Sequence, residues 1–188
     1  QIPDAKFICY EPSPVFFEEA KENLKTVPHT EFYQNIDQVP RGSVDLLFCL
    51  EVFEHLPEKE THDALQTISG LLKPGGEVVI GVPVEVGIPA LYKGIFRMTR
   101  RFGAYDANPK NVFLSFIGSP PQDRPHGEIE PGFGYHFPHT GFDYREFSKT
   151  LAGYFDLKKV STSPFHAPGT LFMPEVYFSL EKPNNAAA

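Results

Sequence analysis

Residues 44–56 read VDLLFCLEVFEHL, and this stretch decides the fold. Its first seven residues are almost all apolar, and a continuous apolar run of this length predicts a strand of a buried parallel sheet. Three polar side chains follow directly: Glu51, Glu54 and His55. Ligands bind at the carboxyl ends of parallel strands. The stretch therefore predicts a core strand with a ligand-binding site at its carboxyl end.

Short apolar runs and amphipathic stretches alternate on both sides of this strand. Strands are predicted over 6–10, 31–34 and 77–82, and helices over 15–25 and 59–72. The second helix must end at Lys73-Pro74-Gly75-Gly76, because proline cannot continue a helix and glycine favours a turn. Further on, the pattern predicts a helix over 144–152 and strands over 155–161 and 175–181. This order predicts a doubly wound α/β domain.

Composition narrows the possible functions. The chain has 188 residues and a net charge of −7, which disfavours a partner such as nucleic acid or an anionic membrane. No run reaches the ~20 apolar residues of a membrane span. Cys9 and Cys49 lie inside apolar runs and are interpreted as buried thiols of a reducing compartment. We expect a cytoplasmic protein with no nucleic-acid and no membrane partner.

Residues 84–140 differ in composition from the rest of the chain. They are rich in Gly, Pro, Phe and His and show little regular pattern beyond a possible helix over 92–102. A segment of this length is too long for a passive connection. We interpret it as a substrate-binding or lid insertion within a single domain, whose core is formed by residues 1–83 and 141–182.

Glu11 occupies a position with a known physical use, at the carboxyl end of the strand over 6–10. A carboxylate there can accept hydrogen bonds from both hydroxyls of a ribose. Three further blocks follow: NIDQVP at 35–40, VDLLFCLEVFEHL at 44–56 and LLKPGG at 71–76. In this order and spacing, the sequence from Lys6 to Lys182 resembles the class I S-adenosylmethionine-dependent methyltransferases, in particular small bacterial enzymes of type 11 or 12.

The resemblance implies the fold, the cofactor and the reaction. It implies a Rossmann-like, mostly parallel sheet whose last strand, 175–181, is antiparallel. The cofactor would be S-adenosyl-L-methionine, and the reaction methyl transfer to an oxygen or nitrogen of a small-molecule acceptor by a monomer or homodimer. The implied cofactor-binding residues are Glu11, Pro12, Asn35, Ile36, Leu50 and Glu51.

One element of the family pattern is absent from these residues. The Gly-rich motif after the family's first strand does not occur, and the match begins just before the second strand. We expect that the first strand and first helix belong to an N-terminal part outside this chain. Two alternatives stay open: a non-catalytic methyltransferase-like scaffold, and a nicotinamide-dependent oxidoreductase, because a carboxylate after the second strand suits that cofactor too.

Several side chains are candidates for proton transfer. A general base is needed only when the acceptor atom carries a proton at neutral pH. Glu51, Glu54 and His55 follow the strand predicted over 44–50, and we expect His55, His136 and His139 to be the catalytic residues. The pair His136 and His139 could suggest metal ligands, but Pro138 between them disfavours a helical ligand pair. We therefore expect no metal.

Overall fold

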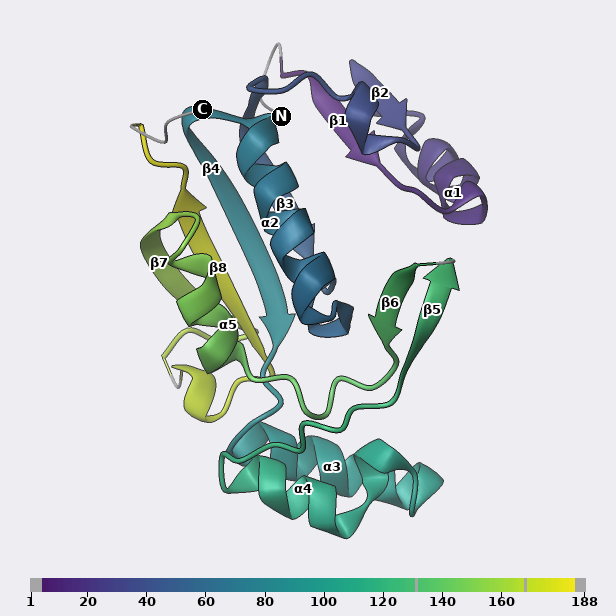
Figure 1. The fold of residues 1–188 in the computed structure, drawn as a ribbon, viewed down its shortest axis with the longest axis vertical. Helices are drawn as coiled ribbons and strands as arrows, with labels where there is room; N and C mark the ends of the chain where they lie inside the picture. Colours follow the sequence, from purple (N-terminus) through teal and green to yellow (C-terminus); the bar gives the residue numbers. More distant parts are fainter. Residues whose placement is uncertain (1–4, 131, 168, 185–188) are drawn as a thin grey trace. The chain divides into compact units, whose positions relative to one another are not determined.

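The computed structural model describes residues 5–130, 132–167 and 169–184. The chain forms two compact units, residues 1–43 and 44–188, called here the first unit and the second unit. Figure 1 shows the elements of each. No helix of the described residues is long and apolar enough to cross a membrane.

The first unit is a single parallel β-α-β arrangement. Strand β1 (Phe7–Tyr10) pairs in parallel with β2 (Thr30–Tyr33), and helix α1 (Pro14–Leu24) connects them. Ser13 is the N-cap and Pro14 begins the helix, because the fixed φ of proline suits the first helical position. A short 3-10 helix, η1 (Ile36–Gln38), follows β2.

The strand predicted over 6–10 forms as β1, but its apolar side chains are largely exposed. Phe7, Ile8 and Tyr10 are each more than 40% exposed. Within its own unit β1 has one strand neighbour and one helix, and Phe17 is the one buried residue of that helix. A strand paired on a single edge and covered by a short helix cannot bury both of its faces.

The second unit contains a four-stranded sheet in the order β3-β4-β8-β7. The strands are β3 (Val44–Leu50), β4 (Leu72–Pro83), β7 (Asp156–Ser163) and β8 (Glu175–Glu181). β3 and β4 are parallel, whereas β8 is antiparallel to both β4 and β7. Three strands therefore run in one direction and β8 in the other, which confirms the predicted antiparallel last strand.

Helices α2 (Glu58–Leu71) and α5 (Tyr144–Leu151) cover one face of this sheet (Figure 1). The core between them is apolar and almost fully buried, and includes Leu65, Ile80, Leu151, Val176, Phe178 and Leu180. β3 was predicted as a strand of a buried sheet, but Leu46, Phe48 and Leu50 are 46–64% exposed. β3 is an edge strand of this sheet, and its apolar side chains alternate between the core and the other face.

The 84–140 segment is more regular than its sequence suggested. It forms α3 (Ile88–Arg101), η3 (Tyr105–Ala107), α4 (Pro109–Phe116) and a hairpin of β5 (His126–Glu130) and β6 (Phe133–His136). α3 and α4 pack closely: a Cβ added to Gly94 would lie 2.5 Å from a methyl carbon of Val112. That residues 84–140 form a substrate-binding or lid insertion remains a prediction. Neither Cys9 nor Cys49 forms a disulfide, and both are only partly buried.

Candidate functional site

Glu54 is a buried carboxylate just after the end of β3. It lies in the 3-10 turn η2 (Phe53–His55), which follows β3 after two residues. Phe53 is 1% exposed and anchors this turn in the core, and the Glu54 side chain is fully buried. Neither Glu54 oxygen makes a hydrogen bond of normal geometry with the described residues. Burial, with a further contribution from the Glu51 charge, raises the pKa of Glu54 to about 8.

Two histidines meet beside this carboxylate. The Nε2 atoms of His55 and His139 lie 3.0 Å apart. Oε1 of Glu54 is 3.8 Å from the His55 Nε2 and 3.9 Å from the His139 Nε2. We call these three residues the Glu-His-His cluster. Its members come from η2 and from the segment after β6, so the fold joins residues that are far apart in sequence.

The orientation of the His55 ring is fixed by two contacts. Its Nδ1 lies 2.8 Å from the carbonyl oxygen of His136. A carbonyl can only accept, so Nδ1 carries the proton and donates, and the Nε2 of a neutral ring keeps its lone pair. The Tyr135 ring stacks on His55 with centroids 4.6 Å apart. The lone pair therefore points toward His139.

The structure divides the three histidines predicted to be catalytic. His55 and His139 are in contact, whereas His136 reaches His55 only through its main-chain carbonyl. The His136 ring lies instead 6.1 Å from that of His126. Burial lowers the pKa of His139 to about 4 and also lowers that of His136. Both rings are therefore neutral near pH 7.

Arg124 ties the two halves of the cluster together. Its guanidinium donates to the carbonyl oxygens of Glu54 and Pro138, the latter at 2.6 Å. Gly141 permits this arrangement, because its φ is +103° and an added Cβ would lie 2.5 Å from the Arg124 side chain. Burial lowers the pKa of Arg124 to about 10. This role could not be predicted from the sequence, because a lone Arg between prolines belongs to no motif.

A second buried network of charged side chains contacts Thr140, the residue after His139. Glu85 is 1% exposed and receives hydrogen bonds from both terminal nitrogens of Arg97, each at 2.8 Å, and from Lys93 at 3.0 Å. Arg97 also donates to the Thr140 hydroxyl at 3.0 Å. Burial alone would raise the pKa of Glu85, but Arg97 and Lys93 hold it below its usual value. Sequence reasoning missed this network too.

A cleft of about 360 Å³ opens beside the cluster. Its lining comes from the ends of β3 and β4, from α3 and from the start of β8, and includes Glu51, Glu85, Lys93, Phe96, Arg97 and His139. Glu51 has a φ of +55°, an unfavourable conformation for a residue other than glycine. Such strained residues concentrate at functional sites. Glu51 therefore marks this cleft as the candidate site of the second unit.

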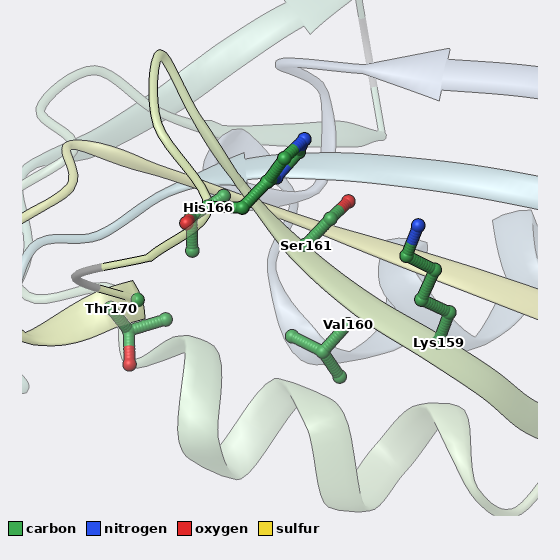
Figure 2. Close-up of a pocket in the computed structure, with 7 residues that line it drawn as sticks. Lys159, Val160, Ser161, His166 and Thr170 are labelled. Carbon is green, nitrogen blue, oxygen red and sulfur yellow. The ribbon is translucent and has the colours of Figure 1, made fainter.

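Another hollow, of about 260 Å³, lies between β7 and the segment that follows it. Figure 2 shows its lining, which includes Lys159, Ser161, His166 and Thr170. Its lining residues include no carboxylate and no pair of histidines in contact. The hollow therefore offers less chemistry than the cleft beside the cluster.

The first unit contains four of the predicted cofactor residues. Glu11 lies at the carboxyl end of β1, as predicted, and its Oε1 accepts a hydrogen bond from the Ser13 amide at 2.9 Å. The Asn35 Oδ1 accepts from the Asp37 amide at 2.9 Å and caps η1, which begins at Ile36. Pro12 is exposed in the turn before α1. The Glu11 carboxylate is thus held by its own turn, in a position that suits a ribose.

Comparison with known proteins identifies the fold to which this geometry belongs. Residues 1–78 match a family model described as a methyltransferase domain. Solved structures of methyltransferases superpose on nearly the whole chain. The chain has the fold of the class I methyltransferases. This confirms the resemblance inferred from the motifs and the predicted α/β fold class.

Three of these methyltransferase structures illustrate the similarity. The N-methyltransferase NodS from Bradyrhizobium japonicum WM9, in complex with S-adenosyl-L-homocysteine, is 12% identical; the match covers 95% of this chain and 67% of NodS, with a TM-score of 0.53. A putative S-adenosylmethionine-dependent methyltransferase from Listeria monocytogenes is 14% identical. The match covers 94% of this chain and 80% of that protein, with a TM-score of 0.56. The 1,6-didemethyltoxoflavin-N1-methyltransferase from Burkholderia thailandensis, with bound 1,6-didemethyltoxoflavin and S-adenosylhomocysteine, is 13% identical. The match covers 94% of this chain and 60% of that enzyme, with a TM-score of 0.50. No match was found among the curated proteins.

Proposed function

We propose that the protein transfers a methyl group from S-adenosylmethionine to an oxygen or nitrogen of a small-molecule acceptor. The observation that carries the proposal is the position of Glu11 within the methyltransferase fold. A carboxylate at the carboxyl end of β1, held by the Ser13 amide, suits the two hydroxyls of the cofactor's ribose. Two solved relatives contain the product of this cofactor, S-adenosylhomocysteine.

The residues of the first unit fit this cofactor. Glu11 and Pro12 would hold the ribose. The side-chain amide of Asn35 and the main chain of Ile36 would lie beside the adenine, and the short helix that Asn35 caps fixes that main chain. Leu50 and Glu51 of the second unit remain predictions as further cofactor residues. When bound, the cofactor supplies an activated methyl group on a sulfonium, so the protein's task is to position the acceptor and exclude water.

The acceptor would bind in the cleft beside the Glu-His-His cluster. Phe96 offers it an apolar contact, and Glu51 and His139 offer polar ones. Of the three histidines predicted to be catalytic, His139 alone is among the lining residues of this cleft. Chemistry on the acceptor would therefore take place at the His55–His139 pair. The bound 1,6-didemethyltoxoflavin of the Burkholderia enzyme supports a small-molecule acceptor.

Binding and turnover assays separate this function from its alternatives. Transfer of a tritiated methyl group to members of a panel of hydroxylated and nitrogen-containing small molecules is the expected result. Binding of S-adenosylmethionine without transfer to any of a broad panel would favour the non-catalytic scaffold. Binding of a reduced nicotinamide nucleotide in place of S-adenosylmethionine would favour the oxidoreductase and overturn the proposal.

A further inference from the structure

The Glu-His-His cluster contains an unusual combination for a protein interior. A fully buried carboxylate, Glu54, makes no hydrogen bond of normal geometry with the described residues, although two imidazole nitrogens lie within 4 Å of it. An unpaired buried carboxylate is costly, so such a group takes up a proton, pairs with a cation or coordinates a metal ion. Arg124 does not neutralise it by direct contact, because its hydrogen bonds go to the carbonyl oxygens of Glu54 and Pro138.

The distances in the cluster match those around one metal ion. Ligand atoms bonded to a zinc-sized ion at about 2.0–2.2 Å can lie no more than about 4.4 Å from one another. The three separations, 3.0, 3.8 and 3.9 Å, all satisfy this limit. Two imidazole nitrogens and one carboxylate oxygen are a ligand set that first-row divalent metals favour. The remaining coordination positions would be open.

The surroundings of His55 are those of a metal ligand. A metal-bound histidine commonly donates its other ring N–H to a carbonyl or carboxylate, which fixes the tautomer and aims the lone pair at the ion. The His55 Nδ1 makes this contact with the His136 carbonyl, and Tyr135 holds the ring plane. Arg124 links the main chain of Glu54 to that of Pro138, next to His139. The ligand positions are therefore fixed without an ion.

We propose that Glu54, His55 and His139 bind one divalent transition-metal ion, such as Zn²⁺. Its open coordination positions would be accessible from the cleft, because His139 belongs to both the cluster and the cleft lining. An oxygen ligand that enters from the cleft would lose its proton more readily once bound to the ion. The site itself does not require that the protein transfer methyl groups.

The competing interpretation is a hydrogen bond between two neutral rings. In that case the Nε2–H of His139 donates to the His55 Nε2, and the 3.0 Å separation needs no ion. This interpretation leaves the buried Glu54 carboxyl, which interacts with that of Glu51, without a bond to either ring, whereas a metal ion would bind all three side chains. A measurement of metal binding therefore distinguishes a metal site from a hydrogen bond between the two rings.

The test is a Zn²⁺ titration of metal-free protein, in competition with a chromophoric chelator and without S-adenosylmethionine. The wild type is expected to bind one equivalent, and Co²⁺ in its place should give visible d–d absorption. Glu54→Gln and His139→Ala should each weaken Zn²⁺ binding at least tenfold. His136→Ala should stay within threefold, since its carbonyl remains, and so should His166→Ala, which removes an exposed histidine from the other hollow.

Several outcomes would overturn the proposal. These are a wild type that binds no stoichiometric Zn²⁺, or Glu54→Gln and His139→Ala variants that keep wild-type affinity. If circular dichroism shows that Glu54→Gln is unfolded, His139→Ala decides alone, because its side chain is partly exposed and at the edge of the core. S-adenosylmethionine binding, measured separately, distinguishes failure of the metal site from failure of the methyltransferase function.

Discussion

The imidazoles of His55 and His139 touch through their Nε2 atoms, 3.0 Å apart, although 84 residues separate them in the sequence. His55 follows β3, and His139 follows the β5–β6 hairpin. The contact therefore joins a motif of the methyltransferase fold to the segment that lines the cleft. We therefore expect substitutions at this contact to change turnover.

His139→Ala should lower turnover and leave cofactor binding intact. The expected loss in kcat/KM is at least tenfold, about 1.4 kcal/mol of transition-state stabilisation. The affinity for S-adenosylmethionine should stay within threefold, because Glu11, Asn35 and Ile36 are unchanged. Steady-state kinetics and calorimetry on the same preparation check both values, with His166→Ala as the control. Equal losses in turnover and in cofactor affinity would assign His139 to a structural role.

Glu85→Gln should destabilise the protein strongly at neutral pH. The substitution leaves Arg97 and Lys93 buried without their counter-charge, and breaking such a buried pair costs about 3–5 kcal/mol. Urea unfolding at pH 7 measures the difference. Glu58→Gln, on the exposed start of α2, should change the free energy of unfolding by less than about 1 kcal/mol.

The stability due to Glu85 should also depend on pH. Its pKa is lower in the folded protein than in the unfolded chain, where it is about 4.3. A depressed folded pKa stabilises the protein above the unfolded value, and this contribution is lost as pH falls below about 4.3 toward the folded value. The gap between wild type and Glu85→Gln should therefore narrow in acid. A gap that is constant from pH 7 to the acid limit would contradict the assignment.

Arg124→Gln should loosen the connection between the two halves of the cluster. The guanidinium makes two charge-assisted hydrogen bonds to carbonyl oxygens, each worth roughly 1.5–3 kcal/mol. We expect a lower Tm and, as a readout of position, weaker Zn²⁺ binding, although Arg124 is no ligand. Arg100→Gln, on the exposed face of α3, is the control and should change stability by about 0.5 kcal/mol or less. Unaltered Zn²⁺ affinity in Arg124→Gln would remove its positioning role.

The sequence predicted the strands of this fold well where their apolar pattern was strong. The bounds of β3 and β8 agree with the predicted 44–50 and 175–181, and the antiparallel direction of β8 followed from the family resemblance. The β5–β6 hairpin was missed. Its residues show no regular alternation, and it is held partly by a tertiary contact between the Gly134 amide and the Glu60 carboxylate.

The residues of the candidate site could be predicted from the sequence, but their arrangement could not. Glu54, His55 and His139 were each named as candidates for catalysis, but their contact depends on the path of the chain between them. The complete burial of Glu54 and the bridge made by Arg124 are tertiary facts with no local signal. The expectation of no metal was argued from His136 and His139, whereas the structure places His139 in contact with His55. The Zn²⁺ titration tests that expectation.

The most direct test of the central claim is calorimetric titration of S-adenosylmethionine into the wild type, Glu11→Ala and Glu18→Ala. Loss of the Glu11 carboxylate removes two charge-assisted hydrogen bonds to the ribose, so binding should weaken at least tenfold, a change of about 1.4 kcal/mol. Glu18→Ala alters an exposed carboxylate of α1 and should bind like the wild type. No detectable binding by the wild type, or equal affinity in Glu11→Ala, would contradict the proposal that the protein is an S-adenosylmethionine-dependent methyltransferase.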